Sequence, residues 1–242
     1  MKFIKMSGLV IDWTQMPTYN TIMSLAAGAA LLSLLWFGWN LMKGKTDHPA
    51  AAWGLNFGVL GFILTATGLH MTLTWPFAKY FPFDNIIFGE PSLGFGVLLL
   101  AAAVLLWRRG DRLDASENCA RDVARMITPL SIFIVGLGLA LIAICFAGII
   151  FQLFAAPPEE PISGAFAAYP WVEAIFMSGL FGIIGVGAVL FPFALKSFST
   201  GAPLKVIHII IGIVWGGAGI GFLLFGALNY FTHIGLIVNT MG

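Results

Sequence analysis

Residues 126–158 read MITPLSIFIVGLGLALIAICFAGIIFQLFAAPP and contain no charged side chain. A helix of roughly 18 or more apolar residues is long enough to cross the hydrocarbon core of a bilayer. Five further stretches are equally free of Asp, Glu, Lys and Arg, namely 13–42, 49–78, 91–107, 174–195 and 206–242. The chain is therefore expected to form an all-α, polytopic membrane helix bundle of about six transmembrane helices.

The composition is typical of a membrane domain and differs from that of a soluble domain. Hydrophobic residues make up 59% of the chain and charged residues 10%, against roughly 45–50% and 25% in soluble domains. The net charge of +1 argues against nucleic acid as a partner. The expected helices occupy about 19–42, 50–75, 89–107, 127–154, 172–195 and 205–229. They leave no room for a soluble domain, so 1–242 is predicted to be a single transmembrane domain.

Basic residues are unevenly shared between the two sets of loops. Alternate loops face the same side of a membrane, and one set carries nine of the twelve Lys and Arg residues: Lys43, Lys45, Arg108, Arg109, Arg112, Arg121, Arg125, Lys196 and Lys205. The other set carries Lys2, Lys5 and Lys79. Because cytoplasmic loops are enriched in Lys and Arg, both termini are predicted to face outward.

The last apolar stretch is too long for one straight span. As a helix, residues 206–242 would run about 55 Å at 1.5 Å per residue, and the hydrocarbon core is about 30 Å thick. We therefore expect a turn near Asn229–Tyr230. The apolar tail 230–242 would then lie in the outer interface or against a neighbouring chain.

Small residues recur at helical spacing within three of the expected helices. The pairs are Gly54/Gly58, Gly212/Gly216 and Gly217/Gly221. Such pairs allow close approach of helices, which predicts that the second, fifth and sixth helices form the tightly packed centre. The alternative is local unwinding around a transported solute.

Ionisable residues point to a candidate site near the outer face. His70 lies inside the second expected span, and ionisable groups within spans are candidates for function. Glu90 and Glu173 begin helices on the same side, and His233 would join them if the chain folds back. Imidazole and carboxylate together suit copper, zinc or iron, or a quinol proton path, and a bound lipid or quinol is a further possible occupant. The alternatives are a neutral His70 hydrogen-bonded to a neighbouring helix, and glutamates that stabilise helix starts.

Two segments around this candidate site carry a family resemblance. The run Gly68-Leu-His70-Met-Thr-Leu-Thr-Trp75-Pro76, followed by Asn85-Ile-Ile-Phe-Gly89-Glu90-Pro91-Ser92, resembles a bacterial and archaeal integral-membrane family of the domain-of-unknown-function 981 type. The resemblance implies a small multi-helix protein of the bacterial or archaeal cell membrane, with His70 and Glu90 in its motif. It implies no activity.

Three functions follow from these patterns. The favoured one is a non-catalytic accessory or structural subunit of a larger membrane complex, for example a redox complex such as a copper membrane monooxygenase or a respiratory enzyme. Scarce hydrophilic surface and aromatic outer loops at 76–88 and 155–170 favour such partners. The first alternative is a small membrane redox protein that binds a metal or quinol at the His/Glu site. The second is a small-solute transporter built from inverted halves, 19–107 and 127–229.

Overall fold

The computed structural model describes residues 8–16, 19–44, 48–201 and 205–241, so Lys2, Lys5 and Lys45 of the charge argument lie outside it. Across these residues the chain forms helices and turns without a strand. Six helical segments are long and apolar enough to cross a membrane. The spans are built on α1 (Asn20–Met42), α2 (Ala50–Thr74), α4 (Glu90–Asp114), α6 (Ser131–Phe151), α7 (Pro170–Thr200) and α8 (Lys205–Thr240). The all-α membrane bundle predicted from the sequence is confirmed.

Short helical turns extend two of the spans. The one-turn α3 (Pro82–Asp84) and a π-helical turn at Asn85–Gly89 lead into α4, and α5 (Cys119–Ile127) leads into α6. Helix α4, which forms the third span, continues past Trp107 as far as Asp114. The Asp114 carboxylate accepts hydrogen bonds from the backbone N–H of Ala50 at 3.0 and 3.2 Å, so it caps the start of α2.

The predicted turn at Asn229–Tyr230 is wrong. The last helix is continuous from Lys205 to Thr240, and the tail 230–242 is helical through Thr240 instead of folding back. No proline interrupts this stretch, and Thr232 and Thr240 are fully buried. The helix is about 54 Å long at 1.5 Å per residue. Its last turn packs against the N-terminal segment and the loop between α6 and α7, and these two segments form a cap over one end of the bundle. This end is called the outer end below, because the excess of Lys and Arg at the opposite end predicts that it faces outward.

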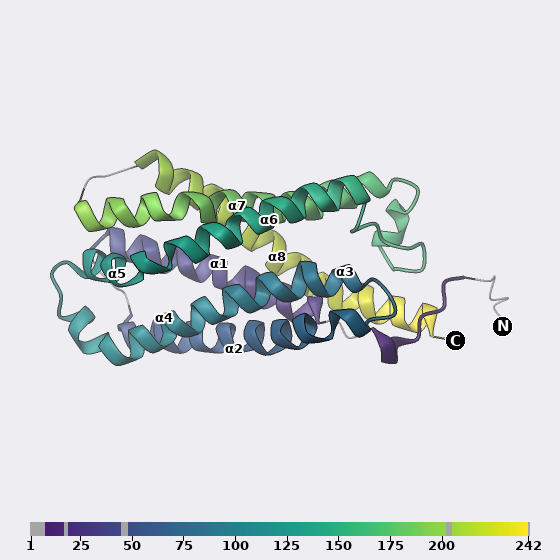
Figure 1. Cartoon of the computed structure of the whole chain (residues 1–242), viewed down its shortest axis with the longest axis horizontal. Helices are drawn as coiled ribbons and strands as arrows, with labels where there is room; N and C mark the ends of the chain where they lie inside the picture. The colour runs from purple at the N-terminus through teal and green to yellow at the C-terminus, as the bar shows by residue number, and fades with distance from the viewer. Residues whose placement is uncertain (1–7, 17–18, 45–47, 202–204, 242) are drawn as a thin grey trace.

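Three antiparallel helix pairs build the bundle, α1 with α8, α2 with α4, and α6 with α7 (Figure 1). Each pair has a glycine at a close approach of its helices, Gly28, Gly68 and Gly138 respectively, where an added Cβ would meet the partner helix's backbone. The expected centre of second, fifth and sixth helices is therefore wrong, because α2 packs on α4. Gly212 and Gly217 have no neighbour within 4 Å of such a Cβ.

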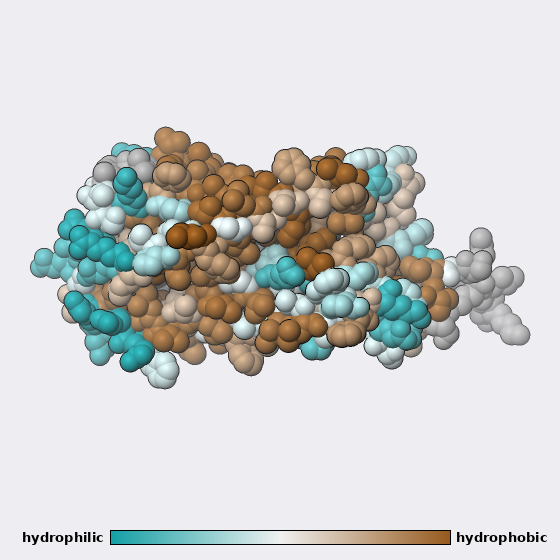
Figure 2. Space-filling model, viewed as in Figure 1, coloured by the Kyte–Doolittle hydropathy of each residue, from teal (hydrophilic) through white to brown (hydrophobic). Residues whose placement is uncertain are grey.

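The two ends of the bundle differ in their content of basic residues. Helices α1, α4 and α7 end, and α2 and α8 begin, at one end of the bundle, whereas α8 ends at the other (Figure 1). In Figure 2 the middle of the visible face is mostly hydrophobic, and hydrophilic side chains gather toward the two ends. A bilayer would cover such a middle zone. The basic end is predicted to be cytoplasmic by the excess of Lys and Arg there.

Cysteine accessibility tests this orientation. Glu117 and Lys79 are exposed residues at opposite ends, and each can be replaced by cysteine in a Cys119→Ser, Cys145→Ser background. A membrane-impermeant maleimide should label the Lys79→Cys protein in intact cells and the Glu117→Cys protein only after the cells are opened. The reverse pattern would show that the termini face the cytoplasm.

Candidate functional site: a cavity inside the bundle

A cavity of about 890 Å³ lies between the helix pairs, at the upper end of the 300–1,000 Å³ range of small-molecule sites. Its walls come from α1, α4, α6, α7 and α8, together with the N-terminal segment and the loop between α6 and α7. It is not sealed, because the lining residues Leu130 and Ile234 are 37% and 60% exposed. A ligand inside could therefore exchange with the surrounding bilayer.

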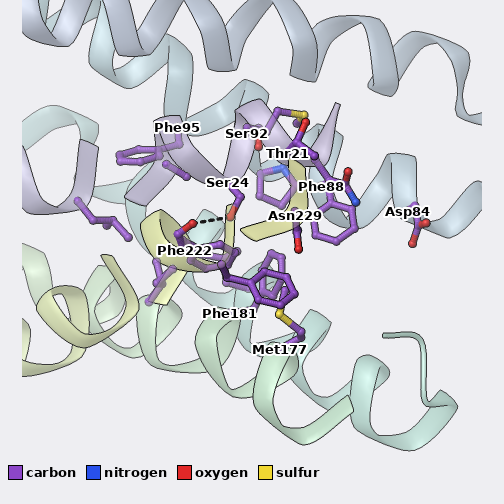
Figure 3. Close-up of a pocket in the computed structure, with 18 of the residues that line it drawn as sticks. Thr21, Ser24, Asp84, Phe88, Ser92, Phe95, Met177, Phe181, Phe222 and Asn229 are labelled. Carbon is purple, nitrogen blue, oxygen red and sulfur yellow. Dashed lines mark hydrogen bonds between the residues drawn. The ribbon is translucent and has the colours of Figure 1, made fainter. Parts of the chain in front are cut away.

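Aromatic rings form the apolar body of this cavity. Phe154, which follows α6, stacks on Phe181 of α7 with the ring centroids 5.7 Å apart. Phe88 contacts Phe154 at 5.9 Å, and Phe222 of α8 contacts Phe181 at 5.5 Å. Phe88, Phe181 and Phe222 are seen together in the cavity wall in Figure 3. Four separate chain segments thus contribute to one apolar surface that suits a hydrocarbon chain or a ring.

The turn before α4 places a carboxyl group in the cavity wall. Phe81 adopts a left-handed conformation (φ 46°, ψ 53°), and Pro82 then starts the single turn of α3. Asp84 follows, immediately before the π-helical turn, a type of distortion that is frequent at functional sites. Asp84 lines the cavity, and no hydrogen bond or ion pair joins its carboxyl group to another described residue.

Asn229 brings an unpaired polar group to the same cavity. The residue lies in α8, lines the cavity and is only 4% exposed. Its Oδ1 atom has no hydrogen-bond partner among the described residues, whereas Ser24, also in the wall, donates to the Phe222 carbonyl at 2.7 Å. Figure 3 shows Asn229 beside Phe88 and Phe181. Burying an unpaired acceptor costs about 1–3 kcal/mol, so this atom is suited to a ligand that donates a hydrogen bond.

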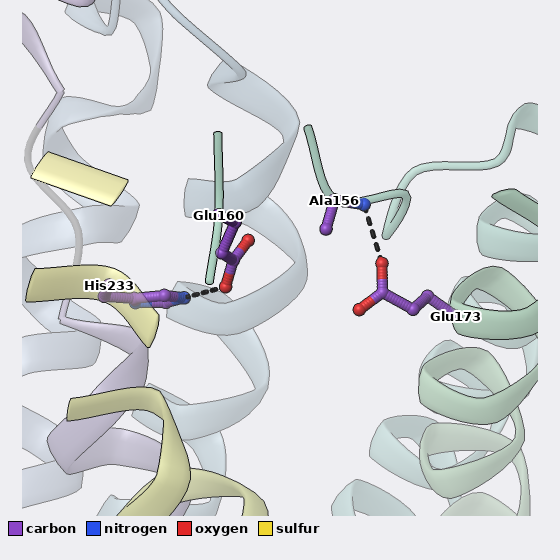
Figure 4. A network of polar contacts seen from close by, with 4 residues as sticks. All are labelled: Ala156, Glu160, Glu173 and His233. Carbon is purple, nitrogen blue, oxygen red and sulfur yellow. Dashed lines mark hydrogen bonds and ion pairs between the residues drawn. The ribbon is translucent and has the colours of Figure 1, made fainter. Parts of the chain in front are cut away.

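Two further carboxylates and a histidine complete the polar end (Figure 4). His233 Nε2 lies 3.7 Å from Glu160 Oε1. Glu173, in the first turn of α7, accepts a hydrogen bond from the backbone N–H of Ala156 at 2.7 Å. Burial raises the pKa of Glu160, and the charge of Glu173 acts in the same direction. The outer end of the cavity is therefore acidic and poorly solvated.

The loop between α6 and α7 is held over this end. The backbone N–H of Leu9 donates to Glu159 Oε1 at 3.0 Å, and Asn239 Nδ2 donates to the Glu159 carbonyl at 2.7 Å. Gly235 makes room for Pro161, because an added Cβ would overlap the proline ring. The N-terminal segment and the end of α8 thus fix the loop that carries Glu160.

The four residues predicted as a site are separated in the structure. Glu173 and His233 line the cavity, but His70 and Glu90 do not. His70 and Glu90 are both exposed, and His70 packs edge-on against the ring of Tyr19 at 5.5 Å. No hydrogen bond or ion pair joins them within the described part of the chain. Nor do any three His, Cys, Asp or Glu residues there form a group that could hold a metal ion.

Comparison with protein families identifies the family of this chain. The model of a family described as "Protein of unknown function (DUF981)" matches residues 16–235. The chain belongs to the DUF981 family. The match spans every polar residue of the cavity's outer end, and it confirms the resemblance seen around His70 and Glu90. No curated protein and no solved structure matches the chain, and the DUF981 description assigns no activity.

Three residues of the polar end were not predicted for this DUF981 site. Asp84 and Glu160 belong to aromatic or proline-rich outer segments, which gave no indication of which acids face inward. Asn229 stands in the longest apolar stretch, and a polar residue within a span was the available signal. The sequence prediction places a turn at Asn229, which the continuous helix α8 contradicts.

Proposed function

We propose that this protein binds an amphipathic, membrane-resident small molecule in the cavity of its helix bundle. One observation carries the proposal, the 890 Å³ cavity that combines an aromatic body with a polar outer end. Close packing of a hydrocarbon chain against these rings would add many small dispersion contacts. The polar end would fix the head group.

The cavity's position fits a ligand that arrives through the lipid. Leu130 and Ile234 are exposed members of the lining near opposite ends of the cavity. The rest of the body is walled by spans that a bilayer would surround. We propose further that the protein resides in the bacterial or archaeal cell membrane, as its family resemblance implies, with the basic end in the cytoplasm.

The accessory-subunit function stays a prediction. Its main support was the scarcity of hydrophilic surface, and a bilayer would cover the apolar zone of Figure 2 without a protein partner. The transporter function also stays a prediction. In the first half the second and third spans pair, α2 with α4, and in the second half the first and second pair, α6 with α7. If the two halves were inverted repeats of one three-helix unit, the same two spans of each half would pack together.

Filling the cavity tests the proposal. Ala102 of α4 is half-buried and lines the cavity, whereas Val104 on the same helix is 52% exposed and does not. In native mass spectrometry of protein purified in mild detergent, the wild type should carry a noncovalent amphipathic adduct. Ala102→Trp should reduce its occupancy at least about tenfold, equivalent to about 1.4 kcal/mol of binding free energy.

The control is Val104→Trp, which should keep the adduct because its new side chain faces outward. Ala188→Trp, which fills the opposite wall from α7, repeats the test if Ala102→Trp fails to give monodisperse protein. Equal occupancy in the wild type and in folded cavity variants would overturn the proposal, as would a wild type that binds no amphipath.

A further inference from the structure

We infer that the cavity selects an amphipath whose head group donates hydrogen bonds and carries no negative charge, such as an amine or a hydroxyl compound. The inference rests on the proposed function and names the ligand class of the same site. It is argued from the acidic side chains and the Asn229 amide that line the cavity, and from the lack of lysine and arginine in its described wall.

Three carboxyl groups give the outer end several hydrogen-bond acceptors. Carboxyl groups of Asp84, Glu160 and Glu173 line it, and no lysine or arginine lies in the described wall. Glu173 is partly satisfied by the Ala156 N–H. Glu160 lies 3.7 Å from His233 and also interacts with the Thr232 side chain. Asp84 has no polar side-chain contact to a described residue. Asp84 and Glu160 therefore keep acceptor positions that a ligand can fill.

Asn229 is an independent indication of the same ligand chemistry. It comes from α8, whereas the acids come from the segments before α4 and around the start of α7. Its unpaired Oδ1 is almost completely buried in the cavity wall. Buried acceptors in native proteins are normally paired, so a ligand N–H or O–H at this position would remove an otherwise uncompensated desolvation.

Anionic head groups are disfavoured by the same arrangement. A phosphate or carboxylate would lie beside up to three acidic side chains with no basic side chain in the described wall to neutralise it. Like charges at short distance in a poorly solvated site repel strongly. His233 is the one group there that can become cationic, and it already faces Glu160.

Three probes with the same alkyl chain test the inference: hexadecylamine, hexadecan-1-ol and hexadecanoate. Each is added at the same concentration to the delipidated full-length protein in mild detergent, and occupancy is measured by native mass spectrometry. We expect amine or alcohol to bind at least about tenfold more than carboxylate, since their head groups can donate hydrogen bonds to the acids and the carboxylate cannot. The amine and alcohol arms distinguish a cationic from a neutral donor.

Charge-neutralising variants connect the selectivity to the cavity. Asp84→Asn with Glu160→Gln should reduce the ratio of amine to carboxylate binding at least about fivefold, because two acidic groups are removed. Glu90→Gln is the matched control, since Glu90 is exposed at the same end and does not line the cavity. It should leave the ratio unchanged.

The outcomes separate this inference from the proposed function. If hexadecanoate binds as well as the other probes, and Ala102→Trp still blocks all three, the head-group inference is wrong and the binding function stands. The same conclusion follows if the double variant leaves the ratio unaltered. If no probe binds the wild type, both the inference and the binding function fail.

Discussion

Replacing Gly68 with leucine should abolish recovery of folded, monodisperse protein in mild detergent. A Cβ at this position would lie 2.5 Å from the backbone nitrogen of Leu93 and 2.7 Å from the carbonyl oxygen of Gly89. Both atoms are backbone atoms of the segment that pairs with α2, so no side chain can move aside. Overpacking a core usually costs 1–3 kcal/mol, and separating two helix backbones would cost more.

The matched control is Gly136→Leu, because a Cβ at Gly136 of α6 would have no neighbour within 4 Å. Size-exclusion chromatography and the midpoint of thermal unfolding provide the measurements. The control should elute and unfold like the wild type. A Gly68→Leu protein with an unchanged midpoint would mean that α2 and α4 are not packed as closely as the structure places them.

The number of spans was predictable because it depends on composition alone. Each charge-free stretch is longer than a bilayer needs or is extended by its neighbours, and no tertiary contact is required to identify it. The first and last residues of the helices were less predictable where contacts with distant parts of the chain determine them. Helix α4 continues to Asp114, whose carboxylate caps Ala50 on another helix. The sequence around Asp114 contains no indication of that partner.

Packing was harder to predict than the spans because spacing identifies small residues but not the face that meets a partner. Gly212 and Gly217 belong to regular pairs and have open space around them. Gly28 belongs to no pair singled out in the sequence, and it sits where α1 meets the backbone of Leu223. Spans that are apolar on every side give no amphipathic pattern to fix their orientation.

The same limit explains the mixed result for the site. His70 was chosen because it is ionisable and lies within a span, but α2 turns it toward Tyr19 and the outside. Glu173 and His233 were placed at the correct end of the bundle, and the structure puts both in the cavity wall. The acid that faces His233 is Glu160, which is carried by a loop whose course depends on contacts with Leu9 and Asn239.

Ending the chain after Tyr230 should lower the midpoint of thermal unfolding by about 6–12 °C and expose the loop between α6 and α7 to proteases. The deleted part of α8 makes three hydrogen bonds to the cap: Thr240 with Ile11 at 3.1 Å, Thr240 with Trp13 at 3.1 Å, and Asn239 with Glu159 at 2.7 Å. At about 1 kcal/mol each they contribute roughly 3 kcal/mol, and 1 kcal/mol shifts the midpoint by about 2–4 °C in a chain of this size.

A chain ending at Met241 is the control, because it keeps all three hydrogen bonds and should match the wild type. Limited proteolysis adds a local measurement, since cleavage between residues 153 and 169 should accelerate in the truncated protein before the bundle unfolds. The sequence alone suggested that this tail contacts another polypeptide, which would leave the isolated chain's stability unchanged on deletion. An unchanged midpoint and unchanged cleavage would therefore favour contact of the tail with another polypeptide. They would contradict a stabilising contact of the tail with the cap of the same chain.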